Sequence, residues 1–527
     1  MVKPLSLRKA LAAAAIAFVL IAIAFGIYLR DRWPYRGRIV VPALAETFSS
    51  TLTVGSYKRF YFPNPGFTAH NIVLHLHGST NIPPLATVET LTATGSYVDF
   101  ILHPHHLASL DIVGLHVQIS PPETPGNGTR YLSGPSSPST VIVDHVTANQ
   151  SVLDVSTAQD KPPLHFAIHT LSLRNVSRSH PIVYQVAFSN PTPPGEITSQ
   201  GHLGPLKRDD FGSTPLSGQA NLADADLSVF HGIAGKAQTA ASFHGLLSRI
   251  QIDGSTQVPD FHVGPGQPEP LSATYHALLN ATRGSLVLGN VQATAGQTKI
   301  NATGTIDRTQ GSHLTLAVPN GRVQDLMRMF ARKGAPVTGT ATLHADVFIP
   351  PDHHHFLRSL QATASFAVSN LHFVHPKTQH TLDGFSQRAS GKAPKEKLAD
   401  ADAAAPIVAS ELQTRHLILH EGVAHFDDLL FSLPGAHADG VGTFNLLNKQ
   451  VDATGNLHMD SDLSDATTGI KSLLLEPIDP FFRHKHGTVA PVHLGGTYDQ
   501  PTLGLALPGD RNHPRRKPSK GASKVVK

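Results

Sequence analysis

The 527-residue chain contains no cysteine, one tryptophan and only 6% aromatic residues. Without cysteine, neither disulfides nor thiolate metal sites can form. Positive charge is also scarce in the body of the chain, because it is concentrated at the two ends. Of the 42 Lys and Arg, seven precede residue 39 and seven follow residue 510. Residues 39–510 therefore carry 28 basic and 37 acidic side chains. The body therefore carries a formal charge of −9 and lacks the basic stripe of a nucleic-acid binder, so no nucleic-acid partner is expected.

Catalytic signatures are missing as well. The chain holds no G-x-S-x-G elbow, no P-loop and no G-x-G-x-x-G motif followed by a helix. His420-Glu421 and His425 resemble a zinc-protease signature with one residue too many, and we place them on a turn between strands. Asp427 and Asp428 are adjacent in a predicted strand and would point to opposite faces, which argues against a paired-carboxylate enzyme. We expect no enzymatic activity, no cofactor and no designed metal site.

Histidine is abundant, with 33 residues, but its clusters lack ligand spacing. His353 to His355 follow two prolines in a predicted turn, and His75 and His77 share a strand face with no carboxylate nearby in sequence. We interpret the triplet as a solvated turn or an adventitious metal contact rather than a designed site, whereas the shared face of His75 and His77 leaves metal binding open.

One long apolar run stands near the N-terminus. Leu11 to Leu29 is long enough, at 1.5 Å per residue, to cross a bilayer as a helix. Basic residues before it favour a cytoplasmic N-terminus, although four arginines follow it, and Ala22-Ile23-Ala24 leaves a cleavable signal peptide as the alternative. We prefer an uncleaved inner-membrane anchor, with the bulk of the chain in the periplasm. The anchor residues are Leu11, Phe18, Leu20, Ile23, Phe25 and Leu29.

The remainder reads mostly as strands. Ala362, Ala364, Phe366 and Val368 alternate with polar or small residues, and Leu371 and Phe373 resume the row after Asn370. Similar alternation marks Leu314 to Val318 and the region from Phe444 to Val451, and Gly or Pro pairs such as Pro434-Gly435 and Gly495-Gly496 predict turns. Short helices are predicted over 322–333 and over about 464–476. Gln387 to Pro406 is predicted to be a mobile polar loop.

Linkers suggest the domain organisation. Pro121 to Pro138 is rich in Pro, Gly and Ser, and Pro191 to Gly195 forms a second break. The predicted parts are a cytoplasmic N-terminus (1–9), a transmembrane anchor (10–30), an N-terminal β domain (39–190), a second β region (191–507) and a basic disordered tail (508–527).

Several stretches, taken in order, resemble AsmA-like proteins. The similarity covers about residues 200–507 and lies in segments that join glycine turns to alternating strands: Asp226 to Gly235, Ala241 to Phe261, Thr282 to Val291, Ile300 to Gly304, Gly440 to Gly455 and Ala490 to Pro501. The resemblance implies an inner-membrane anchor, a long periplasmic β-groove, and a role in moving lipids or maintaining the envelope. The high histidine content and the basic tail depart from the family pattern.

We therefore predict a mainly β protein, with an elongated, curved antiparallel sheet that forms a groove, or alternatively an array of β-sandwiches. The predicted partners are phospholipids or other acyl-chain lipids and the inner membrane. A non-enzymatic scaffold that binds an envelope protein is the alternative function. The residues expected to face lipid are Ala364, Phe366, Val368, Leu371 and Phe373.

Overall fold

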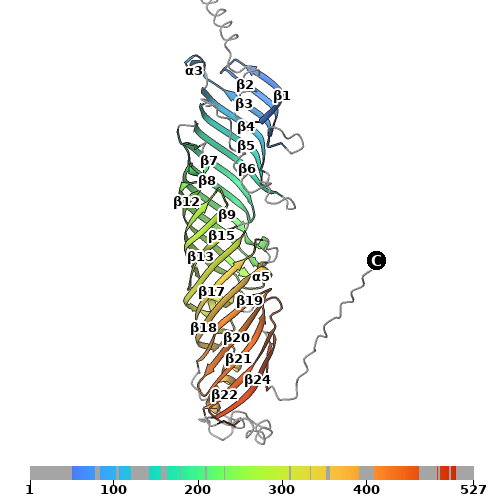
Figure 1. Cartoon of the computed structure of the whole chain (residues 1–527), viewed down its shortest axis with the longest axis vertical. Coiled ribbons are helices and arrows are strands. Elements are labelled where there is room, and N and C mark those ends of the chain that lie inside the picture. The colour runs from blue at the N-terminus through green and yellow to red at the C-terminus, as the bar shows by residue number, and fades with distance from the viewer. Residues whose placement is uncertain are drawn as a thin grey trace, which may run out of the picture. The chain divides into compact units, whose positions relative to one another are not determined.

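The computed structural model describes residues 50–505, apart from 77–83, 103–105, 120–141, 156–162, 178–179, 208–209, 231, 308–309, 333, 352–355, 391–408, 462–482, 485–486 and 498–499. The predicted anchor, the helix predicted over 464–476 and the basic tail lie outside the described residues. Among those that are described, no helix is long and apolar enough to span a membrane. The fold is mainly β, with a large curved sheet and a few short helices, as predicted (Figure 1).

The chain forms two compact units. Unit 1 holds Met1–Asp226, Ala237–Ser255 and Leu278–Gly284, and unit 2 holds Leu227–Lys236, Thr256–Ala277 and Ser285–Lys527. Strands β11 (Lys236–Leu246), β12 (Arg249–Val263) and β13 (Glu269–Asn280) cross this division.

Unit 1 is a sheet of strands that pair in sequence order. All pairs from β1 to β9 are antiparallel except β4 and β5, which are parallel. Our prediction of an antiparallel sheet is therefore wrong at this pair. Parallel neighbours need a connection of a dozen or more residues, and the stretch of sequence between Ile119 and Ile142 is long enough for one. The elements are β1 (Ser50–Phe60), β2 (Gly66–Leu76), β3 (Ala86–Thr94), α3 (Tyr97–Leu102), β4 (His106–Ile119), β5 (Ile142–Val155), β6 (Leu164–Val176), β7 (Ile182–Pro191), β8 (Pro194–Leu203), η2 (Phe211–Ser213) and β9 (Pro215–Asp226).

Unit 2 continues the same construction from β14 onward, with antiparallel pairs throughout the described strands. Its elements are η3 (Leu227–Phe230), β10 (Ile233–Ala234), β14 (Ser285–Ala295), β15 (Thr298–Asp307), β16 (Gly311–Arg322), α4 (Val323–Arg328), β17 (Val337–Ile349), α5 (Phe356–Ser359), β18 (Gln361–Phe373), α6 (Pro376–Ala389), β19 (Ser410–His420), β20 (Val423–Leu433), β21 (Ala436–Asn445), β22 (Val451–Met459), β23 (Arg483–His484), β24 (Gly487–Thr497) and β25 (Gln500–Leu505).

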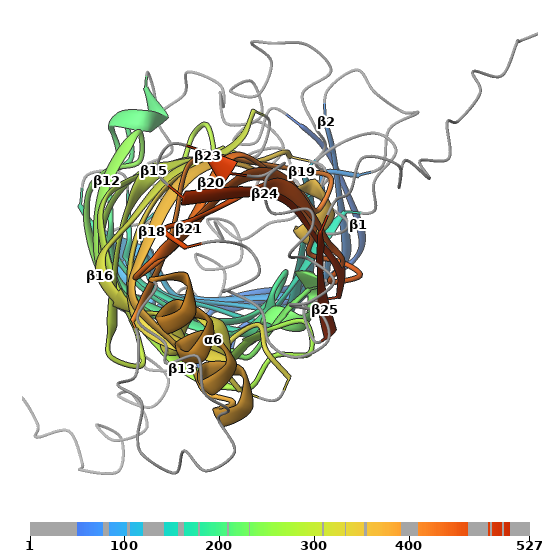
Figure 2. The same ribbon diagram turned by 90° about the horizontal axis from the view of Figure 1, so that it is seen from below.

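Neither run of strands is a sandwich. The strands β1 to β9 of unit 1 and β14 to β25 of unit 2 each pair side by side in a single sheet rather than in two stacked sheets. Figure 2 shows the strands of unit 2 following arcs. The alternative of a sandwich array is therefore wrong for the described strands.

Most local sequence predictions hold within unit 2. The alternation over 362–373 lies in β18, and that over 314–318 lies in β16. Pro434-Gly435 is the turn between β20 and β21, whereas Gly495-Gly496 lies inside β24, so the turn predicted there is wrong. The strand predicted through Phe444 and Val451 is also wrong, because the chain turns between β21 and β22.

The helices differ more from prediction. The one predicted over 322–333 exists as α4 but is only six residues long, and its Asp325 is buried and accepts hydrogen bonds from Thr298 Oγ1 (3.1 Å) and Gln297 N (2.9 Å). The loop predicted from Gln387 is wrong at its start, because α6 extends to Ala389.

Candidate functional site

The five residues predicted to face lipid lie on β18. Four of them, Ala364, Phe366, Val368 and Leu371, belong to one row of apolar side chains. Ala364 and Leu371 are buried, at 8% and 4% exposure, while Phe366 and Val368 are half-buried. Thr363 and Ser369, on the opposite face, are exposed. Asn370 has a φ of 52° and the pairing with β19 shifts between Val368 and Leu371, so a bulge returns Leu371 to the apolar row. The half-buried Phe373 ends the strand.

Neighbouring strands continue this row through their register. Ala364 pairs with Ala345 of β17 on one side and with Leu417 of β19 on the other. Ala345 pairs in turn with Leu316 of β16, and Leu417 pairs with Phe426 of β20. Directly opposed residues share a face of a sheet, so apolar side chains lie beside one another across five strands.

The same face extends through most of unit 2, and we call it the unit 2 apolar face. It comprises Leu314, Leu316 and Val318 on β16; Leu343, Ala345 and Val347 on β17; Ala362, Ala364, Phe366 and Val368 on β18; Leu412, Leu417 and Leu419 on β19; Ala424, Phe426 and Phe431 on β20; Ala438 and Phe444 on β21; Val451, Ala453 and Leu457 on β22; and Ala490, Val492 and Leu494 on β24. Ten successive strand pairs join β14 to β25. At about 4.8 Å per strand, this sheet runs for about 50 Å.

The opposite face is polar and carries histidine–carboxylate pairs. His458 Nε2 lies 2.6 Å from Asp439 Oδ1, and His493 Nε2 lies 2.9 Å from Asp452 Oδ1. These pairs join adjacent or diagonal positions on neighbouring strands, where exposed ion pairs contribute little to stability. We interpret this face as the solvated side of the sheet.

Helix α6 covers the unit 2 apolar face at one end. Its Ala389 is fully buried in a cluster with Ala436, Met459 and Ala490, and Phe385 packs against this cluster. Two hydrogen bonds fix the helix: Ser386 Oγ donates to Pro434 O (2.6 Å), and Phe373 N donates to Gln379 Oε1 (2.8 Å). The helix therefore shields apolar side chains over β21, β22 and β24.

A carboxylate interrupts the apolar row at a bulge between β19 and β20. Asp428 accepts hydrogen bonds from Thr414 Oγ1 (2.6 Å) and from the backbone nitrogens of Arg415 (3.1 Å) and His416 (3.1 Å). The Thr414 hydrogen bond, opposed by burial and aided by the backbone donors, holds the pKa of Asp428 below its ordinary value of 3.8. This carboxylate satisfies backbone groups that the bulge leaves unpaired.

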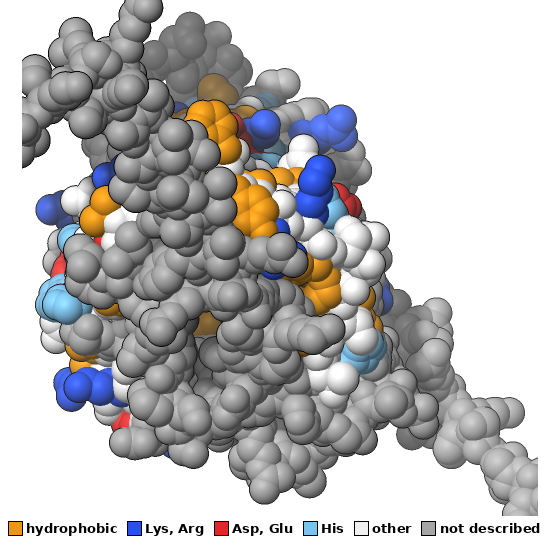
Figure 3. All heavy atoms as spheres, turned by 90° about the horizontal axis from the view of Figure 1, so that it is seen from above, with side chains coloured by type: hydrophobic (Ala, Val, Ile, Leu, Met, Phe, Trp, Pro, Cys, Tyr) orange, Lys and Arg blue, Asp and Glu red, His pale blue; other side chains and the backbone are white. Residues whose placement is uncertain are grey.

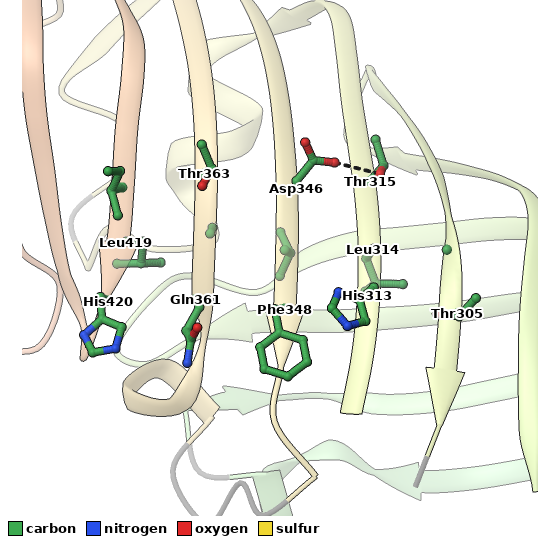
Figure 4. Close-up of a pocket in the computed structure, with 14 residues that line it drawn as sticks. Thr305, His313, Leu314, Thr315, Asp346, Phe348, Gln361, Thr363, Leu419 and His420 are labelled. Atoms are coloured by element: carbon green, nitrogen blue, oxygen red, sulfur yellow. Dashed lines mark hydrogen bonds between the residues drawn. The ribbon is translucent and has the colours of Figure 1, made fainter. Parts of the chain in front are cut away.

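A pocket of about 590 Å³ opens at the strand ends of β15 to β19. Thr305, His313, Phe348, Gln361 and His420 line it from five neighbouring strands (Figure 4). The rings of His313 and Phe348 lie 4.6 Å apart, and Thr315 Oγ1 donates to Asp346 Oδ1 at 2.8 Å. The lining mixes aromatic, amide and imidazole groups, and the described residues bring no carboxylate pair with catalytic geometry into it.

The histidine groups singled out in the sequence can be followed only in part. Among the described residues, no group of three or more His, Asp or Glu side chains is placed to hold a metal ion. Glu421 and Gly422 have φ values of 51° and 76° and form the turn between β19 and β20, so His420 and His425 do not share a helix face. His353 to His355 and His77 lie outside the described residues.

Unit 1 carries an apolar face of its own. Phe67, Ala69, Ile72 and Ala93 are buried on β2 and β3, and half-buried Leu52, Val54, Tyr57, Val88, Leu91, Leu107 and Leu110 pack against them. The register continues the row into β5, where Leu110 pairs with Val146. The sequence reasoning missed this face, although Phe67, Ala69 and Leu91, Ala93 show the same alternation that revealed β18.

No protein-family model, curated protein or solved structure matched this chain. The AsmA-like resemblance therefore rests on the sequence segments given above.

Proposed function

We propose that this chain is a membrane-anchored periplasmic protein that shelters the acyl chains of phospholipids on the apolar faces of its curved sheet, and so takes part in lipid handling and envelope maintenance. The observation that carries the proposal is the unit 2 apolar face. Apolar side chains stand in register across successive strands, and the paired strands of this unit form one sheet rather than two stacked ones. Such a face needs an apolar cover, because exposed apolar area is unfavourable in water.

Acyl chains could provide this apolar cover, because burying them is energetically favourable. Burying each CH₂ is worth about 0.8 kcal/mol, so a chain of many methylenes gains strongly by leaving water for an apolar face. A lipid bilayer offers the same gain, and exchange between bilayer and protein is therefore close to balanced. A protein that moves lipid needs this balance, because a site that bound much more tightly than the membrane would not release its cargo.

A site-specific photo-crosslinker tests the proposal. Placed at Val368, within the apolar row, it should yield lipid adducts in cells, whereas at exposed Ser369 on the opposite face it should not. The two positions are neighbours in sequence, so expression and local structure are matched. A dominant protein adduct at Val368 would instead favour the scaffold alternative.

Purified protein provides a second readout. We expect phospholipid to copurify with the chain and to be lost in Val368→Glu, because a carboxylate in an apolar row costs several kcal/mol. Ser369→Glu should retain it. If wild-type protein carries no lipid and transfers none between vesicles, the proposal is wrong.

A further inference from the structure

Unit 1 ends in an exposed apolar tip that we call the unit 1 tip. It consists of Tyr61 and Phe62, in the turn between β1 and β2, and Val98 in α3. Their exposures are 43%, 87% and 64%. A single exposed apolar side chain is ordinary, but three of them gathered at one end of unit 1 form an exposed apolar patch, the kind of surface that serves as an interaction site.

The tip is a built structure rather than a loose loop. The Tyr97 hydroxyl donates to the Tyr61 carbonyl, and Gly95 N donates to Pro65 O at 2.8 Å, so the β1–β2 turn and the start of α3 are tied together. Beneath it, the rings of Tyr57 and Phe67 stack with centroids 5.1 Å apart. The exposed side chains are therefore presented on a rigid base.

Basic residues accompany the apolar ones. Lys58 and Arg59 of β1 are exposed and precede Phe62 by four and three residues. The carboxylate of α3, Asp99, lies 3.4 Å from His106 Nδ1. Figure 3, which looks onto this end, shows hydrophobic side chains with Lys or Arg side chains, and some Asp or Glu, around them. Aromatic rings next to cations are the pattern that proteins use at the boundary between headgroups and acyl chains.

The segment between the predicted anchor and β1 limits how far unit 1 can lie from a membrane. Twenty residues separate Leu29, the end of the predicted anchor, from Ser50, the start of β1. At about 3.5 Å per extended residue, this tether reaches at most about 70 Å. The predicted anchor would therefore keep Ser50, which lies at the other end of β1 from the tip, within about 70 Å of a bilayer.

We propose that the unit 1 tip inserts into the interfacial region of an anionic lipid bilayer, with Phe62 and Val98 at the level of the acyl boundary and with Lys58 and Arg59 among the headgroups. This contact is independent of acyl-chain binding on the apolar faces of the sheet. It gives unit 1 a fixed attachment to the membrane beyond its tether.

Depth-dependent fluorescence quenching tests the contact in the full chain, reconstituted into vesicles of phosphatidylglycerol and phosphatidylethanolamine. Trp33, the only tryptophan, is first replaced by Phe. In that background, the indole introduced by Phe62→Trp or Val98→Trp should lose most of its fluorescence to lipids brominated near the headgroup and little to aqueous acrylamide. Leu246→Trp, at a less exposed apolar position of unit 1 (42%), is the control and should respond to acrylamide alone.

The outcomes separate the possible occupants. Quenching by brominated lipid at both tip positions, reduced by Lys58→Glu with Arg59→Glu, supports the proposal. Quenching by acrylamide alone, as in the Leu246→Trp control, would overturn it, since the tip would then face water. Protection from both quenchers would also overturn it, because the tip would then be covered by protein. Lipid copurification with the same variants reports on the apolar faces separately, so failure of either idea leaves the other intact.

Discussion

Phe366 and Phe426 lie edge to face, with ring centroids 6.4 Å apart and planes at 90°, although β19 separates their strands. Phe366 pairs with Thr414 of β19, a small residue that leaves room for the two rings to meet above it. This contact joins three strands of the unit 2 apolar face and shows that side chains of the row pack on one another.

Phe366→Ala should lower the free energy of unfolding by about 2 kcal/mol, less than for a fully buried ring, because Phe366 is half-buried. Thr363→Ala, on the exposed face of the same strand, should change it by no more than about 0.5 kcal/mol. Urea unfolding of the two variants compares them. Equal losses would mean that the two faces contribute alike to stability.

Asp428→Ala should cost about 2 kcal/mol, because it leaves Thr414 Oγ1 and two backbone nitrogens without their acceptor. Asp427→Ala is the matched control, since Asp427 is exposed on the same strand, and it should be nearly neutral. Chemical unfolding at neutral pH gives both values. A catalytic role for the two acids would instead predict loss of an activity without loss of stability.

The stabilising effect of Asp428 should also depend on pH. Because its pKa is lowered in the folded state, its contribution is complete above the ordinary value of 3.8 and is lost as pH falls through the lower, folded value. The difference in unfolding free energy between wild type and Asp428→Ala should therefore be constant near pH 6 and shrink below about pH 4. A difference that grows on acidification would contradict this assignment.

His106 should show the opposite pH dependence. Its hydrogen bond to Asp144 (2.7 Å) raises its pKa above 6.5, against the effect of burial, and Asp99 adds to the rise. A raised pKa contributes stability fully below 6.5, and that contribution is lost as pH rises through the folded value. His106→Gln should thus cost about 1 kcal/mol at pH 5.5 and much less at pH 8.5. Thermal unfolding at the two pH values, with exposed His202→Gln as the control, measures the effect.

Gly435→Ala should loosen α6 from the unit 2 apolar face. Gly435 has a φ of 86°, and an added Cβ would lie 2.5 Å from the backbone nitrogen of Ser390, just after the helix. Gly334→Ala is the control, because Gly334 has a φ of 88° with open space around it. The control should cost about 1 kcal/mol from backbone strain alone, and Gly435→Ala distinctly more. Hydrogen exchange in α6 should speed up only in Gly435→Ala.

Local sequence patterns predicted the strands of unit 2 well. The alternation from Ala362 to Phe373 identified β18 and the faces of its side chains, because successive residues of a strand must point to opposite sides. The same reasoning failed for α6. Its sequence from Pro376 to Ala389 includes two glutamines, one lysine and one histidine, and it has no regular apolar stripe. Its buried Gln379, Asp383 and Ser386 form a polar stripe that tertiary contacts, not hydrophobic periodicity, hold in place.

The sequence by itself determined that each strand has an apolar and a polar side, since the period of two is a property of the backbone. Only the tertiary structure decided how the apolar sides of neighbouring strands align with one another. Register, the bulges at Asn370 and Asp428, and the parallel pairing of β4 with β5 depend on contacts between residues far apart in the chain. Local propensity does not encode such contacts, so the alignment of separate apolar rows into a continuous face emerged only when the strands were paired.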